Sequence, residues 1–463
     1  MPKNILNIEK NSGVIIMRYI PATEEQKKEM LKEIGVSSFE DLIENIPQSL
    51  RLKEKLNIPE AMSESELEDN IFHIAKKNAN FYSIKPLIGA GSYRHFIPEA
   101  VKFLLQREEF WTCYTPYQPE LSQGTLQSIF EYQSYISRLT KMEVIIPSIY
   151  DGASATAEAA LMSLRLTHKN KIIVSDLLHP HYRETIKTYL APHETEIIDL
   201  PYKNGLVDMG KLKNLVDEDA ASIIIQNPNF FGGIENMAEI AEIVHSKSAL
   251  LINVIVESMS LGILKAPGEM NVDILVGNAQ SFGMDLNYGG PYNAYLATKK
   301  EYIRQLPGRI IGETTDVDGK RVFVMTLRAR EQDIRREKAT SNICTNHNLN
   351  VIAANIYLSL MGTEGIYQLS LLNTKSAHYL EKLLLKSGKF EKVFNCPFYN
   401  EFLLKSKENI STINKKLLEN NFIPPLKIRE FYQADNLKNV LLFAVTEVLN
   451  RDELNRVAKI LSE

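Results

Sequence analysis

The chain has 463 residues, with 53 Lys and Arg against 57 Asp and Glu and a formal net charge of −4. Its hydrophobic content of 44% and charged content of 24% are typical of a globular protein and exclude a disordered or low-complexity chain. The near balance of charge argues against nucleic acid as the main partner, because polyanion binding usually shows as a cationic excess. Residues 339–363, the longest uncharged run, contain polar side chains that lipid could not satisfy, so we predict no membrane-spanning helix.

The three cysteines, Cys113, Cys344 and Cys396, are widely spaced and form no CxxC pair. This pattern predicts neither a disulfide framework nor a metal site. The first residues also lack the apolar core of a signal peptide. Together these features predict a protein of the reducing cytoplasm.

Residues 1–85 are predicted to form an N-terminal helical arm. Apolar side chains recur at helical spacing among charged ones in residues 24–35. A second helix is expected over residues 63–78, where Ser63 and Glu66 match a capping box.

Residues 86–325 alternate between short β-rich runs and helix-like stretches. The β-rich runs are residues 142–150, 171–176, 194–202, 221–229, 249–256 and 273–279. This alternation predicts a large α/β domain with a mainly parallel sheet that is covered on both faces. Sheets of this kind bind ligands at the carboxyl ends of their strands, so the loops there are the first candidates for a site.

Residues 326–463 are predicted to form a smaller α+β domain. A long helical stretch is expected to run through residues 349–362. The chain then changes character: FEKVF, EFLLK and NVLLFAV are strand-like, whereas STINKKLLEN and DELNRVAKILS are helix-like.

Several strings of mixed polar, aromatic and proline residues stand out from this pattern. They are SYRHFIP (92–98), YTPYQPE (114–120), YDGAS (150–154), QNPNFFG (226–232), PGRIIGET (307–314) and IRREKATSNICTN (334–346). Together they resemble the glycine decarboxylase P-protein family of the glycine cleavage system, in its amino-terminal-half subunit. The resemblance runs from about Tyr19 to about Glu447. It implies an aspartate-aminotransferase-like pyridoxal-phosphate enzyme fold (type I), which agrees with the α/β and α+β domains.

The lysine that a pyridoxal enzyme requires is missing from its expected place. Such an enzyme forms a Schiff base with a Lys at the end of a strand of the large domain. The family's catalytic half is expected to have His-Lys there, but Gln280 and Ser281 occupy the matching positions, and no Lys lies between Lys265 and Lys299. The resemblance therefore implies that pyridoxal phosphate is held by a second, lysine-bearing subunit.

The resemblance places four residues of the YTPYQPE string in a cavity shared with that subunit: Tyr114, Tyr117, Gln118 and Glu120. Prolines within the string make it rigid, so it can reach a partner's site with little loss of entropy. A proline-stiffened surface turn remains the alternative.

Four residues of the IRREKATSNICTN string, Arg335, Arg336, Thr340 and Asn342, are candidates for the subunit junction or for contacts to substrate or phosphate. Arginine clusters suit carboxylate and phosphate groups. A solvated charged face and a helix cap are the alternatives.

Gly152, Ala153 and Ser154 lie where a pyridoxal enzyme places its phosphate on a helix N-terminus, and Glu257 is the nearest carboxylate for the pyridine nitrogen. We interpret these four residues as a vestigial cofactor pocket, with a tight strand-to-helix turn as the alternative. His95 of SYRHF has either a functional or a structural role, and an isolated His is more often structural.

The family's reaction implies that glycine is decarboxylated on pyridoxal phosphate and that the aminomethyl group passes to the lipoyl arm of the H protein. The predicted assembly has two copies of this chain and two of the lysine-bearing subunit, and this chain is expected to be inactive alone. Two other functions stay open: a self-sufficient pyridoxal enzyme, and a purely structural or regulatory subunit.

Overall fold

The structure is a computed structural model that describes residues 22–54, 56–111, 113–327, 331–343 and 347–463. The chain forms two compact units, Met1–Asn78 and Ala79–Glu463. Each unit is described by itself below. Among the helices of the described residues, none has the length and apolar character that crossing a membrane requires.

Among its described residues, the first unit contains three α-helices, α1 (Glu24–Ile34), α2 (Phe39–Leu42) and α3 (Glu64–Ala75), and a short 3₁₀ helix, Gln48–Leu50. Each α-helix begins with a capping box, in which the N-cap side chain and the side chain three residues later bond to each other's backbone N–H. The box predicted from Ser63 and Glu66 at the start of α3 is confirmed. None of the three helices buries a residue, so their ends are specified locally and not by a core.

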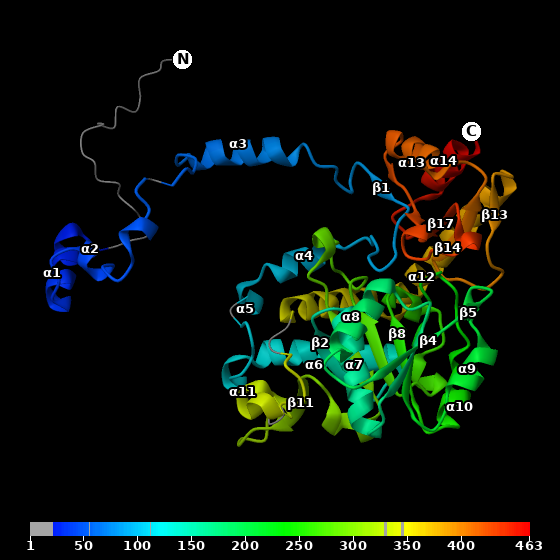
Figure 1. The fold of residues 1–463 in the computed structure, drawn as a ribbon, viewed down its shortest axis with the longest axis horizontal. Coiled ribbons are helices and arrows are strands. Elements are labelled where there is room, and N and C mark those ends of the chain that lie inside the picture. Colours follow the sequence, from blue (N-terminus) through cyan, green and yellow to red (C-terminus); the bar gives the residue numbers. More distant parts are fainter. Residues whose placement is uncertain (1–21, 55, 112, 328–330, 344–346) are drawn as a thin grey trace, which may run out of the picture. The chain divides into compact units, whose positions relative to one another are not determined.

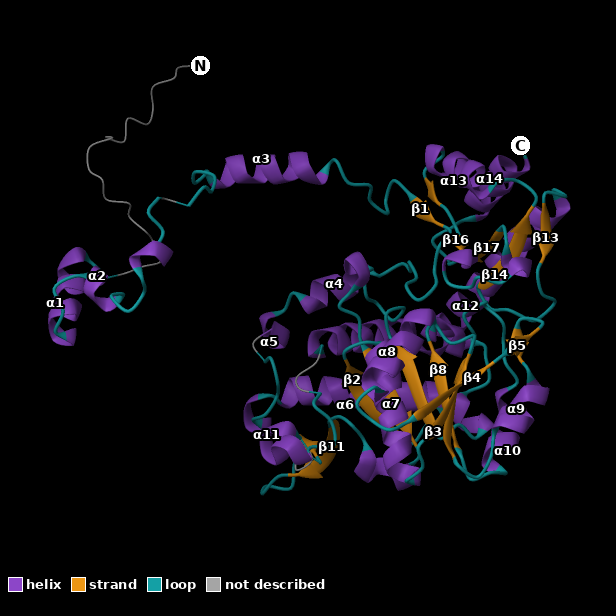
Figure 2. Cartoon of the chain, in the orientation of Figure 1, coloured by secondary structure: helices purple, strands orange, loops and turns teal. Residues whose placement is uncertain are grey.

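The centre of the second unit is a seven-stranded sheet in the order β2-β10-β9-β8-β7-β3-β4 (Figure 2). Its strands are β2 (Val144–Ile149), β3 (Lys171–Ser175), β4 (Glu196–Leu200), β7 (Ala220–Gln226), β8 (Leu250–Ile255), β9 (Ile274–Asn278) and β10 (Ala294–Thr298). Strand β10 runs antiparallel to both of its neighbours, and the other pairs are parallel. The mainly parallel sheet predicted from the β-rich runs is confirmed.

Helices cover both faces of this sheet, which explains why its central strands β7, β8 and β9 are mostly apolar and buried. On β7, Ile223 belongs to a core shared with α6 (Gln123–Thr140), α10 (Met237–His245) and α12 (Asn348–Lys386). Its neighbour Ile224 belongs to the other core, shared with α7 (Gly152–Thr167) and α8 (Pro180–Leu190). These two helices lie on one side of the sheet (Figure 1).

The C-terminal part carries a second sheet of four antiparallel strands in the order β13-β14-β17-β16. These are β13 (Phe390–Lys392), β14 (Glu401–Ser406), β16 (Leu426–Lys427) and β17 (Val440–Ala444), packed with helices α13 (Ile410–Glu419) and α14 (Arg451–Ser462). An early segment joins this part, because β1 (Lys85–Pro86) pairs in parallel with β15 (Phe422–Ile423).

Helix α12 is longer than the stretch predicted to run through residues 349–362. It extends to Lys386 and is interrupted at Gly362, whose φ of 58° is not helical. The sequence beyond Gly362 regains the helix because Ile366, Ala377 and Leu380 are buried along it. Packing against the core therefore continues the helix past a residue that resembles an end signal.

The remaining elements are shorter. They are α4 (Glu99–Leu105), α5 (Glu108–Trp111), α9 (Met209–Leu215), α11 (Gln332–Arg335), and the hairpins β5 (Tyr202–Lys203) with β6 (Leu206–Val207) and β11 (Ile310–Thr315) with β12 (Arg321–Thr326).

Candidate functional site

The carboxyl end of β9 carries Gln280 and Ser281 where the resemblance calls for His-Lys. The Gln280 side chain is buried and accepts a hydrogen bond from the backbone N of Tyr93 at 3.0 Å. It donates to the carbonyl oxygens of Tyr93 and Met284, both at 2.9 Å. Ser281 is also buried, and its hydroxyl has no hydrogen-bond partner among the described residues. Gln280 thus bonds the backbone of residues 89–96, called the early segment below, to the carboxyl end of β9.

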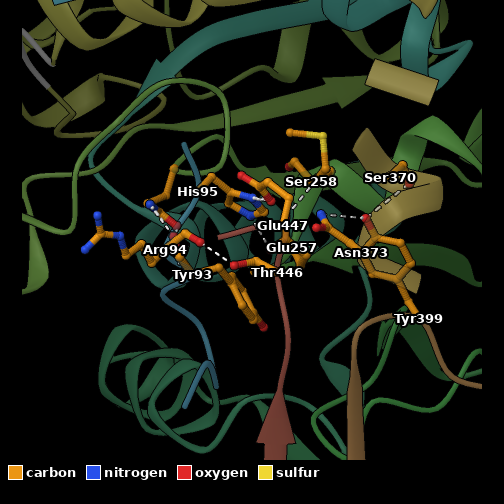
Figure 3. Close-up of polar contacts among 12 residues, drawn as sticks. Tyr93, Arg94, His95, Glu257, Ser258, Ser370, Asn373, Tyr399, Thr446 and Glu447 are labelled. Carbon is orange, nitrogen blue, oxygen red and sulfur yellow. Dashed lines mark hydrogen bonds and ion pairs between the residues drawn. The ribbon is translucent and has the colours of Figure 1, made fainter. Parts of the chain in front are cut away.

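The carboxyl end of β8 leads to Glu257, which is part of a buried ionic group with His95 and Glu447 (Figure 3). Nε2 of His95 lies 3.0 Å from a carboxylate oxygen of Glu257, and Nδ1 lies 2.9 Å from one of Glu447. Both ring nitrogens face carboxylates, so both donate and the ring is an imidazolium. Burial lowers the pKa of His95, but the charges of Glu447 and Glu257 outweigh it and raise that pKa to about 10.

The third member, Glu447, comes from the loop after β17. Burial disfavours its charged form, but the charge of His95 and hydrogen bonds, including one from the backbone N of Phe96 at 2.7 Å, hold its pKa below the usual value. The ionic group therefore connects the large sheet, the early segment and the C-terminal sheet.

A second set of bonds joins the same early segment to the C-terminal sheet. Glu401 on β14 accepts hydrogen bonds from the backbone N of Ala90 and from the hydroxyl of Tyr93, both at 2.7 Å. Burial raises the pKa of Glu401 to about 7, against these hydrogen bonds. The hydroxyl of Thr446 donates to the carbonyl of Arg94 at 2.5 Å (Figure 3).

After β3, His179 is buried and neutral. Its Nδ1 accepts from the backbone N of His181 at 3.2 Å, so Nε2 carries the proton and donates to the carbonyl of Ala90 at 2.9 Å. Burial lowers the pKa of His179 to about 4. His95, which belongs to the early segment, is therefore cationic, whereas His179, which contacts that segment, is neutral.

The N-terminus of α7 holds the candidates Gly152, Ala153 and Ser154. It is already capped by a carboxylate, because Asp151 accepts from the backbone N of Ser154 at 2.8 Å. A Cβ on Gly152 would lie 2.1 Å from the hydroxyl of the buried Tyr182. Only glycine fits at position 152, because the side chain of Tyr182 takes the space that a Cβ would need. With Tyr182 in this space and Asp151 capping the helix, the residues present do not fit a pyridoxal phosphate in this chain.

The YTPYQPE string lies beside Arg309, a residue that the sequence patterns did not single out. Nη2 of Arg309 donates to the hydroxyl of Tyr117 at 3.1 Å, and its guanidinium lies 5.3 Å from the centre of that ring. Nε of Arg309 donates to both carboxylate oxygens of Glu331, at 2.7 and 2.8 Å. Glu331 is the N-cap residue of α11, so Arg309 brings the YTPYQPE and IRREK strings together.

The other candidate residues of the string, Tyr114, Gln118 and Glu120, are exposed. The side chain of Tyr114 is 78% exposed, and its carbonyl accepts from Asn348 at 3.1 Å. Gln118 and Glu120 lie at the start of a short 3₁₀ turn, and both side chains are exposed. A small cavity under the string is lined by Thr115, Pro116, Ile129, Pro147, Ser148, Arg309, Ile311, Met325 and Asn348.

The IRREKATSNICTN string contributes exposed and half-buried groups. Arg335 and Arg336 are exposed at the end of α11 and in the turn that follows, and Asn342 is also exposed, whereas Thr340 is half-buried. Between the last two, Ser341 donates to Glu158 on α7 at 2.8 Å. Cys344 and the last two residues of this string lie outside the described residues. Within the described part of the chain, no group of His, Cys, Asp and Glu is arranged to hold a metal ion.

Comparison with known proteins assigns the family. The model of the glycine cleavage system P-protein family matches residues 17–461. The chain belongs to this family. It is 47% identical to the probable glycine dehydrogenase (decarboxylating) subunit 1 of Moorella thermoacetica, over 95% of this chain and 98% of that protein. It is 43% identical to the protein of the same name from Anoxybacillus flavithermus, over 97% and 99% of the two chains.

Solved structures confirm the predicted type I pyridoxal-phosphate fold. An inhibitor-bound glycine decarboxylase (P-protein) superposes with a TM-score of 0.87 at 38% identity, covering 96% of this chain and 99% of that one. A sphingosine-1-phosphate lyase of Burkholderia pseudomallei, at 14% identity, has a TM-score of 0.64 over 90% and 94% of the two chains, which shows the shared fold alone.

The sequence did not identify three residues that bond to Tyr93, His95 and Tyr117 in this P-protein family member: Glu401, Glu447 and Arg309. Arg309 stands in PGRIIGET, a string that marked the family but whose Arg was not selected. Glu401 and Glu447 stand in ordinary strand-like surroundings, and no local signal distinguishes them from other acidic residues. They are recognisable only once the fold brings them to Tyr93 and His95.

Proposed function

We propose that this chain is subunit 1 of a two-subunit glycine decarboxylase and that a second subunit carries the pyridoxal phosphate and its lysine. The names of the relatives support a divided enzyme. The single observation that carries the proposal is the pair Gln280 and Ser281 at the carboxyl end of β9, where neither side chain can form a Schiff base.

In the assembled enzyme, pyridoxal phosphate on the second subunit supplies the electron sink for decarboxylation of glycine. The aminomethyl group then passes to the lipoyl arm of the H protein. A lipoyl arm requires a channel, and a junction between two chains can supply one. We assign part of that channel wall to this chain, in an assembly with two copies of each subunit.

The YTPYQPE string and Arg309 are the part of this chain suited to that wall. Tyr117 is held by Arg309, and Arg309 is itself held by the two bonds to Glu331. A side chain fixed through such a pair presents its group with little rotational freedom. Tyr114, Gln118 and Glu120 are exposed beside it and can contact a second chain or a substrate without rearrangement of the core.

The charged residues of the following string extend the same region. Arg335 and Arg336 are exposed, as contacts to a partner's carboxylates require, and Thr340 and Asn342 offer hydrogen bonds close by. We assign these four residues to the subunit junction. Arginine is well suited to this role because its planar fork binds carboxylate groups in pairs.

Reconstitution tests the proposal. The purified chain should not decarboxylate glycine when lipoylated H protein is supplied, and it should gain activity when the second subunit is added. An active isolated chain would show that it is a self-sufficient pyridoxal enzyme and would refute the division of labour.

Variants test the role of the wall. In the reconstituted enzyme, Y117F and R335A should each lower decarboxylation, whereas Y288F should not, because Tyr288 belongs to neither the YTPYQPE nor the IRREKATSNICTN string. If Y117F and R335A both leave assembly and decarboxylation unchanged, this chain has only a structural role.

A further inference from the structure

One segment, residues 89–96, contacts residues at the carboxyl ends of three strands of the large sheet, the adjacent β8 and β9 and also β3, which lies beyond β7. It forms hydrogen bonds with three side chains, each of which follows one strand: His179 after β3, Glu257 after β8 and Gln280 after β9. In an open α/β sheet this edge is where ligands bind. Here the chain itself makes the polar contacts that a ligand would make.

The backbone of this segment is packed too closely to leave room for a ring. Gly91 has a φ of +111°, which other residues rarely adopt. A Cβ at this position would lie 2.9 Å from Nε2 of His179 and 3.8 Å from a methyl group of Val256. The peptide of Gly91 therefore lies between side chains that follow β3 and β8, where not even one extra carbon fits without movement.

A tyrosine fills the neighbouring space at the start of α7. The hydroxyl of Tyr182 lies so close to Gly152 that a Cβ there would be 2.1 Å away, and it hydrogen-bonds to Asn278 at the end of β9. The helix N-terminus that would hold a phosphate is thus occupied by Asp151 on one side and by this phenol on the other.

The carboxylate expected to face a pyridine nitrogen is also already paired. Glu257 is the carboxylate that the sequence suggests for a pyridine nitrogen, and His95 supplies its counter-charge from within the chain. A pyridinium could approach Glu257 only by displacing His95, which would leave the buried imidazolium with Glu447 alone. Breaking a buried ionic group in this way is costly.

We propose that residues 89–96, together with Tyr182, occupy the place of the cofactor in this chain and tie the large sheet permanently to the C-terminal sheet. The tie runs through Glu401, Thr446 and Glu447, which all bond to this segment. The loss of the lysine is then only one part of the change, because groups of the chain itself also make the polar contacts at this edge of the sheet. This inference rests on contacts within one chain and holds whichever subunit completes the enzyme.

Restoring the lysine is the first test. The full-length S281K variant and the natural chain are each incubated with pyridoxal phosphate, reduced with borohydride and mapped by peptide mass spectrometry. We expect the same background labelling of surface lysines in both and no pyridoxyl group at position 281. A one-to-one adduct at position 281, with the absorbance band of a Schiff base, would overturn the proposal.

Hydrogen–deuterium exchange on the natural chain is the second test and does not depend on the folding of a variant. The amides of Ala90, Tyr93 and Phe96 donate to Glu401, Gln280 and Glu447, so peptides covering residues 89–96 should exchange as slowly as those of β8. Adding pyridoxal phosphate should leave this exchange unchanged. Fast exchange of these peptides, or added protection with pyridoxal phosphate, would contradict a permanent tie.

Discussion

Replacing His95 by Gln tests the buried ionic group most directly. The His95 and Glu257 side chains are 2% and 3% exposed, and the two ring nitrogens lie 3.0 and 2.9 Å from carboxylates of Glu257 and Glu447. Gln keeps hydrogen-bonding capacity but carries no charge, so H95Q leaves two buried carboxylates without a counter-ion. Removing one member of such a group costs about 3–5 kcal/mol, and we expect a loss of that size at neutral pH.

The same group predicts how stability depends on pH. The pKa of His95 is raised from 6.5 to about 10 in the folded chain, so the folded state holds this proton more tightly than the unfolded state. The stabilisation is therefore fully present below pH 6.5 and is lost as the pH rises through about 10. Because a tenfold difference in proton affinity is worth about 1.4 kcal/mol, roughly 2–3 kcal/mol remains at about pH 8 and disappears by about pH 10.5.

Urea unfolding followed by circular dichroism measures both effects. The series begins near pH 8 because Glu235 and Glu401 have pKa values of about 7 in the folded chain. The free energy of unfolding of the natural chain should fall between about pH 8 and 10.5 relative to H95Q. H193Q is the matched control, since His193 is exposed. The ionic group does not act as described if the free energies of unfolding of the natural chain and of H95Q change in parallel over this pH range. The same holds if H95Q lowers the free energy of unfolding by less than about 1 kcal/mol.

Three further variants test separate contacts. Burial raises the pKa of Glu401 from 4.5 to about 7 in the folded chain, so its charge opposes folding increasingly as the pH rises from about 4.5 to about 7. In urea unfolding, E401Q should be about 1–3 kcal/mol more stable than the natural chain near pH 8.5 and equal to it at about pH 4. G232A should lower the free energy of unfolding by more than about 3 kcal/mol in the same assay, because its Cβ would lie 2.0 Å from the backbone oxygen of Glu401. G319A is the control, since Gly319 has a similar positive φ but no atom within 4 Å of the added Cβ, and it should cost only about 1–2 kcal/mol. R309K removes the hydrogen bonds from Nε of Arg309 to the carboxylate of Glu331. The loss of about 1.5–3 kcal/mol of transition-state stabilisation should lower decarboxylation by the reconstituted enzyme about 10-fold or more. R138K, at an exposed arginine, is the control, and equal activity of the two variants would contradict the role of Arg309.

The large sheet was predictable because its signal is local. The run at residues 221–229 contains most of β7, and the run at 249–256 contains β8, since strands buried on both faces are apolar throughout. Helix α12 shows the limit of the same reasoning. Gly362 resembles a helix end, and only burial of the residues beyond it, such as Ala377, continues the helix.

The connections within the site were not predictable, because they join residues that are far apart in the sequence. His95 is 162 positions from Glu257 and 352 from Glu447, and Tyr117 is 192 from Arg309. An isolated His gives no sign of whether its partners are solvent or two buried carboxylates. The family strings marked where specialised residues lie, but only the fold shows which of them meet.

The character of residues 89–96 indicates how a pocket can change once it no longer binds a ligand. A pocket that merely lost its lysine would keep a cavity with unpaired polar groups, and those groups are costly when buried. Here Gln280 bonds at both polar atoms of its amide to the backbone of Tyr93, and Glu257 has a counter-ion in His95. Apolar replacements of similar volume can be at least as stable as a buried ionic group, so stability alone does not explain the charges. Charged groups, unlike apolar ones, are satisfied in only one arrangement of the two sheets, and this requirement explains how the segment can fix that arrangement.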